Sequence, residues 1–358
     1  MEQFNSNMGE TLITHLFLKE EIIMPLKKIN IKLTFVLLLI FFASMLYIFN
    51  TNGNCIYPQK SFENINNSSI NIDVHSGDSI QQAIDNVCSG GTVTVYSGLY
   101  KENLAIDKPL SIISKERKHE NAIIQAADPE RDVFKITANN VTVSGFNITG
   151  SQNKSGIYCS GSGCNITGNK LSYNMYGIYI NNSNRNTQDN NEINDNFFGI
   201  YLNNSTNNQV SNNNFSCFGL IAKLDNGGGG IGGICLEDSN NNRLINNTIL
   251  KYWEGINLTN SSNNELNNNS ILDNYFSLSL INSNNNKVLN NIIVKGGYSF
   301  SVIIYHSQNN TLQGNTGGLN TEIKVTYGFN STNNTLEGEI DNADEPITPK
   351  IGSEDFWV

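Results

Sequence analysis

The sequence predicts an all-β fold, a single-stranded right-handed parallel β-helix (solenoid) of about ten coils. Three observations predict it: polar columns that recur at a fixed interval, apolar columns that keep step with them, and short alternating segments in place of long amphipathic helices. Asparagines recur every 22 to 24 residues with one interval of 34, and serines make the same steps. The two columns are Asn186, Asn208, Asn242, Asn264, Asn286, Asn310 and Asn334, and Ser183, Ser205, Ser239, Ser261, Ser283, Ser307 and Ser331. Because both columns stay in step through the longer interval, they indicate a structural repeat interrupted by one insertion.

Four apolar columns share the interval and predict stacks inside the solenoid. They begin at Ile166, Leu171, Ile178 and Ile180, and one of them is interrupted by Gln188. The I-x-I spacing within a unit has the period of 2 expected of strands. A further asparagine column comprises Asn169, Asn191, Asn213, Asn247, Asn269, Asn291 and Asn315. Since coils stack at ~4.8 Å, we expect the asparagine amides to form ladders at the turns, and we expect right-handed coiling, as in parallel crossovers generally.

The N-terminal region predicts export. The segment 33–49, "LTFVLLLIFFASMLYIF", is uninterrupted by charge and long enough for a transmembrane signal-anchor. Lysines precede it and no Lys or Arg follows until Lys60, which places the N-terminus inside and exports the remainder. A cleaved signal peptide is the alternative. Translation from Met24 would give a shorter N-terminal segment that suits an export signal better, so residues 1–23 are an optional extension of the chain.

The solenoid is expected to begin with a capping helix. In "DSIQQAIDNV", Ser79 suits the N-cap, apolar residues follow at 80, 83, 84 and 87, and a glycine pair at Gly90 and Gly91 stops the helix. "TVTVYSGLY" then predicts one alternating strand. A helix at this point covers the open apolar end of the stack. The predicted organisation is a cytoplasmic tail at 1–32, an anchor at 33–49, a linker at 50–72, the β-helix at 73–340 and a C-terminal tail or cap at 341–358.

The stretch "GDSIQQAIDNV…GGTVTVYSGLYKENLAIDKPLSII" resembles the opening of NosD-like right-handed β-helix domains. The coils "NNxxxNNxxxxxxGIYLxxSxNN" resemble the parallel β-helix repeats of the same family, and the resemblance covers roughly residues 73–340. This family lies within a wider group of carbohydrate-binding and sugar-hydrolysing β-helices that includes archaeal surface proteins. The resemblance implies the fold, and it leaves three roles open: glycan binding at the surface, polysaccharide cleavage, and a NosD-type role at a copper site.

Composition and cysteine spacing indicate which partners and which disulfides to expect. The net charge is −10, with 22 Lys and Arg against 32 Asp and Glu, so nucleic acid is not an expected partner. Export permits disulfides, and two pairs are predicted because each brackets a loop: Cys159 with Cys164, and Cys217 with Cys235.

The outward position of the repeated "G-I-x-L" strand shows no carboxylate or base. It holds Tyr179, Tyr201, Cys235, Asn257, Ser279 and Ile303. Because glycoside hydrolysis uses two carboxyl groups ~5–9.5 Å apart, this face argues against that class of enzyme. The insertion "AKLDNGGGGIGG" at 222–233 is the alternative location of a catalytic site, with Asp225, Glu237 and Glu254 as candidate acids.

Metal sites are weakly indicated. Asp225, Glu237 and Asp238 are oxygen ligands of the kind that suit Ca²⁺, although their spacing is not that of a known calcium loop. The exported part of the chain contains His75, His119 and His306. These histidines lie far apart in the order of coils, whereas the ligands of one copper site must lie close together. No cofactor is expected otherwise.

An aromatic patch is the second candidate site. Met175, Phe197, Trp253 and Tyr275 form one column, and Tyr176, Phe198, Glu254 and Phe276 form the next. If alternation continues through the turn, one column points inward and the other is an exposed stripe suited to sugar stacking. The alternative is that both columns are partly buried at a corner of the coil. The residues predicted to bind carbohydrate are Phe197, Tyr252, Trp253 and Tyr275. We therefore expect a membrane-anchored protein on the extracellular side of the membrane that binds polysaccharide or envelope glycan without catalysis.

Overall fold

The computed structural model describes residues 71–116, 119, 121–218, 230–296, 301–317, 323–328, 330–338 and 340–342. The chain divides into the compact units Met1–Asn54 and Cys55–Val358, and every described residue belongs to the second. The predicted anchor at 33–49, Asp225 and nearly all of 341–358 lie outside the described residues. Within them, no helix has the length and apolar character needed to cross a membrane.

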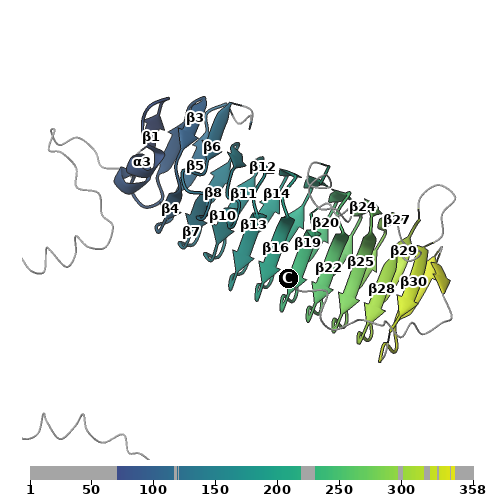
Figure 1. The fold of residues 1–358 in the computed structure, drawn as a ribbon. Helices are drawn as coiled ribbons and strands as arrows, with labels where there is room; N and C mark the ends of the chain where they lie inside the picture. Colours follow the sequence, from purple (N-terminus) through teal and green to yellow (C-terminus); the bar gives the residue numbers. More distant parts are fainter. Residues whose placement is uncertain are drawn as a thin grey trace, which may run out of the picture. The chain divides into compact units, whose positions relative to one another are not determined.

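The second unit is a parallel β-solenoid whose coils stack in chain order (Figure 1). Three sheets, here called A, B and C, form its walls, and sheet C contains 11 strands, so the solenoid has about 11 coils where about ten were predicted. Sheet A comprises β1 (Asn71–Val74), β2 (Thr92–Val95), β5 (Ser111–Ser114), β8 (Thr142–Ser144), β11 (Asn165–Thr167), β14 (Thr187–Asp189), β17 (Gln209–Ser211), β20 (Arg243–Ile245), β23 (Glu265–Asn267), β26 (Lys287–Leu289), β29 (Thr311–Asn315) and β31 (Thr335–Gly338).

Sheet B comprises β3 (Gly98–Lys101), β6 (Ala122–Gln125), β9 (Asn147–Thr149), β12 (Lys170–Ser172), β15 (Glu192–Asn194), β18 (Asn214–Ser216), β21 (Thr248–Leu250), β24 (Ser270–Asn274) and β27 (Ile292–Lys295). Sheet C comprises β4 (Leu104–Ile106), β7 (Phe134–Ile136), β10 (Ser155–Cys159), β13 (Tyr176–Asn181), β16 (Phe198–Asn203), β19 (Gly232–Glu237), β22 (Glu254–Thr259), β25 (Phe276–Ile281), β28 (Val302–Tyr305), β30 (Ile323–Tyr327) and β32 (Ile340–Asn342). Each strand pairs in parallel with its equivalent one coil away, so every register position becomes a column along the solenoid.

The predicted capping helix is present as α3 (Ile80–Asn86), which packs against β1, β2 and β4 at the end of the stack (Figure 1). Ser79 is its N-cap and accepts a hydrogen bond from the backbone N–H of Gln82 at 3.2 Å. The carboxylate of Glu102 also accepts from the N–H groups of Ile80 and Gln81, at 2.8 and 3.0 Å. The single strand predicted after the helix is two strands, β2 and β3, because the chain turns a corner from sheet A to sheet B between them.

The predicted apolar columns form the core. Residues of all four columns, for example Leu171, Ile178, Ile180 and Val210, are fully buried in one continuous cluster. Gln188 occupies a core position between Ile166 and Val210, as the register of β11, β14 and β17 requires. It is fully buried, and neither its amide nitrogen nor its amide oxygen has a hydrogen-bond partner.

Interior asparagines form ladders at two corners of the coils, as predicted, and a shorter third ladder joins Asn174 to Asn196 at the remaining corner. Asn247 is typical: its Oδ1 accepts from the backbone N–H and the Nδ2 of Asn213, both at 3.1 Å. Its own Nδ2 donates to the carbonyl of Val210 and to Oδ1 of Asn269, both at 2.9 Å. The Asn186 column and the serine column repeat this pattern of a side-chain oxygen accepting from the N–H of the preceding coil.

A second set of asparagines lies at exposed turns, where the backbone has positive φ. The φ angle is 51° at Asn182 and Asn260, 50° at Asn282 and 45° at Asn204. Asparagine tolerates this left-handed conformation better than most residues do. The high asparagine content therefore serves two separate structural needs, buried ladders and left-handed turns.

We predict that Asn247→Ala lowers the free energy of unfolding by at least about 3 kcal/mol, because several buried donors and acceptors lose their partner at once. Asn267→Ala, at a partly exposed position of β23, is the matched control and is expected to change stability by no more than about 0.5 kcal/mol. Urea unfolding of both variants makes the comparison, and equal effects would contradict the ladder.

Gln188→Leu is predicted to raise stability by about 1–3 kcal/mol, because it replaces two unpartnered buried polar atoms with apolar volume. Thermal unfolding measures this directly. A lowered melting temperature would mean that the amide has an interior partner.

Candidate functional site

The candidate site lies at the corner where the chain passes from sheet B to sheet C. Five residues that immediately precede sheet C strands form a row along this corner, here called the aromatic edge: Met175, Phe197, Ile231, Trp253 and Tyr275. Backbone hydrogen bonds set the row in register, for example from Ile231 N–H to the carbonyl of Phe197 at 2.7 Å. Tyr173, Phe218 and Ile231, three of the exposed large apolar residues in the described part of the chain, lie at this corner.

Both aromatic columns are partly exposed, as in the alternative in which both lie at a corner of the coil. The second column, here called the outer row, comprises Ser155, Tyr176, Phe198, Gly232, Glu254 and Phe276, and it starts the sheet C strands. The positions that turn inward at this corner are the buried Asn174, Asn196, Tyr252 and Asn274. Strict alternation fails because the chain bends around the corner here, leaving two consecutive side chains outside.

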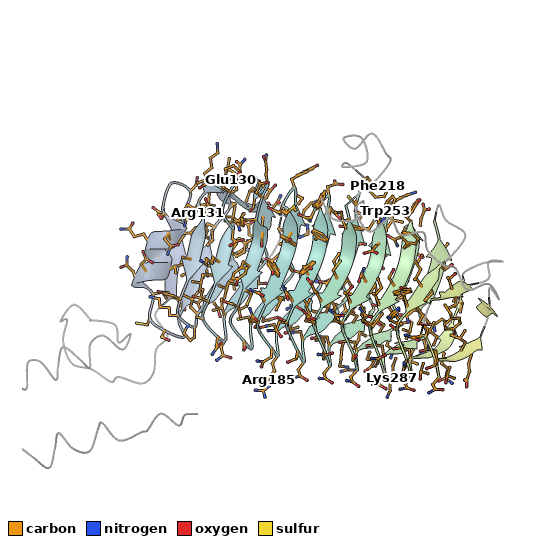
Figure 2. All side chains as sticks on the ribbon, turned by 60° about the horizontal axis from the view of Figure 1, so that its bottom comes forward. Glu130, Arg131, Arg185, Phe218, Trp253 and Lys287 are labelled. Atoms are coloured by element: carbon orange, nitrogen blue, oxygen red, sulfur yellow. The ribbon has the colours of Figure 1, made fainter. Side chains whose placement is uncertain are left out.

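The rings of the two rows stack along the solenoid. Trp253 and Tyr275 have ring centroids 3.9 Å apart with an interplanar angle of 18°, and Tyr176 and Phe198 are 5.1 Å apart at 10°. In each pair, one face of each ring is covered by the ring of the neighbouring coil. Figure 2 shows Phe218 and Trp253 on one rim of the solenoid, opposite the rim where Arg185 and Lys287 lie.

Tyr252 does not belong to this surface, in contrast to the prediction. Its side chain is only 2% exposed because it occupies the inward column that holds asparagine in neighbouring coils. Its ring packs over Gly230, where any Cβ would come within 2.8 Å of it. Burial raises the pKa of Tyr252 well above its usual value, and its hydroxyl has no hydrogen-bond partner.

The outer face of sheet C carries two carboxylates, contrary to the expectation that it carries none. The predicted outward residues Tyr201 and Asn257 do lie there, but so do Glu237, two residues further along β19, and Glu254 at the start of β22. The Tyr201 hydroxyl donates to Oε2 of Glu237. Oε2 of Glu254 accepts from Nδ2 of Asn257 at 2.6 Å.

Cys235 lies between these carboxylates on the same face, and its thiol is not an activated nucleophile. Burial, together with the charges of Glu254 and Glu237, raises the pKa of Cys235 well above its usual value. A thiol needs a lowered pKa to react as a thiolate near neutral pH. Burial also raises the pKa of Glu254, which favours its protonated form.

The structure contains neither of the two predicted disulfides. Cys159 and Cys164 are thiols in hydrogen-bonding contact, and this contact and burial raise the pKa of Cys159. Cys217 belongs to the interior core whereas Cys235 stands on the outer face of β19, so the sheet wall separates the second pair. Cys88 is disulfide-bonded.

The predicted metal ligands do not gather into a site among the described residues. Glu237 is engaged by Tyr201 on sheet C, while Asp238 lies in an exposed turn with φ 49°. The three histidines pack apart, against Tyr96, Glu192 and Tyr305 respectively. The described part of the chain contains no group of three or more His, Cys, Asp or Glu side chains that could hold a metal ion.

Two family models match the chain. Residues 144–317 match the right handed beta helix region, and residues 45–217 match the periplasmic copper-binding protein family (NosD). The chain therefore contains right-handed β-helix and NosD-like domains, as the repeats and the opening motif predicted.

A cell surface glycoprotein of Methanothermus fervidus is 38% identical over 95 residues, which make up 26% of this chain. The chain spans only 15% of the length of that relative. The match therefore relates one part of each protein.

Solved structures share the fold. A DFA-IIIase from Arthrobacter chlorophenolicus A6, crystallised without its lid, has a TM-score of 0.54 and 14% identity over 77% of this chain and 97% of its own. The A-module of the mannuronan C-5 epimerase AlgE6 from Azotobacter vinelandii has a TM-score of 0.50 and 14% identity over 75% of this chain and 92% of its own. At such identities the likeness concerns the fold alone.

We predict that Glu254→Gln makes stability less sensitive to pH. Because the pKa of Glu254 is raised in the folded state, the folded chain keeps a proton that the unfolded chain releases, so stability falls as pH rises from the usual carboxyl pKa through the raised one. The glutamine variant lacks this loss and should melt above the unaltered protein near neutral pH, with the difference closing in acid. Melting curves from about pH 4 to about pH 8 test this; a difference that is constant with pH would be the contrary result.

Proposed function

We propose that this chain is a non-catalytic glycan-binding protein of the cell surface, and that the aromatic edge and the outer row form its binding surface. The observation that supports this most is the concentration of partly exposed aromatic side chains on one corner of a rigid solenoid. Aromatic side chains offer large apolar surfaces for contact with sugar rings, and exposed apolar patches of this kind mark interaction sites.

The comparisons are consistent with this role. The partial match to a cell surface glycoprotein agrees with display at the surface. The segment 33–49 would then serve as the membrane anchor. The predicted linker at 50–72 follows it in the sequence, and its last two residues belong to β1. Both segments stay predictions.

Polysaccharide cleavage is the second candidate, favoured by Glu237 and Glu254 on the outer face. Both side chains are already engaged within the protein, Glu237 by the Tyr201 hydroxyl and Glu254 by the Asn257 amide. We therefore favour binding over cleavage.

A copper role of the NosD kind is the third candidate. Copper prefers imidazole and sulfur ligands. The described histidines lie on separate parts of the solenoid, and the described cysteines are either buried or, at Cys88, disulfide-bonded. These residues do not fit a copper site, so we do not assign that role.

Trp253→Ala is predicted to weaken glycan binding at least about tenfold, since buried or stacked tryptophans commonly contribute 2 kcal/mol or more to an interface. Leu99→Ala, which removes an exposed apolar side chain from sheet B, is the control and should bind normally. Glycan-array and calorimetric binding supply the measurement. Binding of no polysaccharide by the unaltered protein would refute the proposed function.

A further inference from the structure

Several asparagines of this chain open the sequence Asn-x-Ser or Asn-x-Thr, which is the acceptor motif for an N-linked glycan. The motif is frequent by chance in a chain so rich in asparagine, so its presence alone identifies no site. A glycan is bulky and needs an asparagine side chain that reaches solvent. The fold therefore decides which of these asparagines can carry a glycan.

Within the described part of the chain, no asparagine of the buried ladders is an acceptor. In the two longer ladders, the position two residues further on belongs to the core, as Leu171 does after Asn169. At the corner of the aromatic edge, the residue two positions after Asn174, Asn196 or Asn274 is an aromatic member of the outer row. A glycan would therefore never have to replace a buried amide of a ladder.

Exposed acceptors gather at the turn where the chain passes from sheet C to sheet A. The backbone has positive φ at each of the exposed acceptors in this turn, which are Asn140, Asn204, Asn260, Asn309, Asn330 and Asn333. Arg185 and Asn309 occupy the same position in the turn, because each immediately precedes a member of one asparagine ladder. Figure 2 shows Arg185 on the rim opposite Phe218 and Trp253. These acceptors therefore lie on the rim opposite the aromatic edge.

Asn260 and Asn309 are well suited to carry a glycan. Their side chains form no hydrogen bond with another described residue, whereas Nδ2 of Asn204 donates to an asparagine of the coil before at 2.6 Å. Asn260 follows β22 and Asn309 follows β28, two coils further on, so about 9.6 Å separates them along the solenoid. Asn330 and Asn333, in contrast, share one turn, so two glycans there would compete for space.

We propose that Asn260 and Asn309 carry N-linked glycans on the rim opposite the aromatic edge. In the transfer, Nδ2 of the asparagine loses a proton to the transferase and forms a bond to the anomeric carbon of an oligosaccharide. The lipid-linked diphosphate that carried the oligosaccharide leaves from the same carbon with the bonding electron pair. The inference rests on display at the cell surface, which is part of the proposed function, and it is independent of glycan binding.

Peptide mapping by mass spectrometry of the full chain, isolated from the cells that encode it, tests the proposal. Fragmentation should locate a glycan on Asn260 and on Asn309. Asn263 is the internal control: it is exposed in the same turn with φ 61°, but Glu265 stands two positions further on, so it should be unmodified.

Labelling of intact cells with a membrane-impermeant lysine reagent separates the two ways in which this test can fail. A labelled chain with unmodified Asn260 and Asn309 would overturn the inference and leave surface display intact. A chain that the reagent does not reach, and that carries no glycan, would remove both.

Changes at Ser262 separate the acceptor motif from the asparagine itself. Ser262→Ala should leave Asn260 unmodified and lower the mass of the chain by one glycan, whereas Ser262→Thr keeps the motif and should keep the glycan. Asn263→Gln, which changes no motif, is the control and should keep the full glycan mass. A glycan that stays on Asn260 in the Ser262→Ala variant would refute attachment through this motif.

Discussion

The buried asparagine amide is the interaction on which the rest of this structure depends. A parallel solenoid must turn its chain several times per coil, and each turn brings backbone N–H groups into the interior. Such groups are costly to bury without a partner. An asparagine Oδ1 accepts from the N–H of the coil before, as Asn213 does for Asn191 at 2.9 Å, while its Nδ2 remains available for a carbonyl or for the next amide. The ladder thereby gives these buried N–H groups their hydrogen-bond partners, and it also fixes adjacent coils in register.

The site arises where this regularity is interrupted. One coil contains the insertion, of which residues 219–229 lie outside the described residues. Its first described residues are Gly230, Ile231 and Gly232. Gly230 stands where Asn196 stands one coil earlier, so the third asparagine ladder stops and Tyr252 fills the space above it. Gly232 stands where Phe198 stands one coil earlier, so the outer row lacks one side chain there. One interruption therefore accounts for both the buried tyrosine and the missing side chain.

The periodicity of the sequence predicts the fold almost completely. Columns at fixed intervals define which residues stack, so Leu171 and Ile178 could be assigned to the core, and Asn186 to a ladder, without a structure. The corner could not be predicted in the same way. Alternation assigns inside and outside along a strand, but it does not hold where the backbone bends, which is why Tyr252 was placed on the surface and the orientation of the two aromatic columns was left open. Glu237 was named as a candidate acid, but its place on the outer face of sheet C was not predicted, because only the middle of the repeated strand was considered, although β19 continues two residues further.

Amide hydrogen–deuterium exchange of the intact solenoid tests the central claim most directly. If interior asparagine oxygens hold the backbone of the preceding coil, the N–H groups of Asn191, Asn213, Asn247 and Asn269 are protected to the same degree as those of the core strands. Protection should then recur at the interval of the repeat, although these residues are asparagines in turns. Rapid exchange at these positions, with protection limited to the apolar strands, would contradict the account.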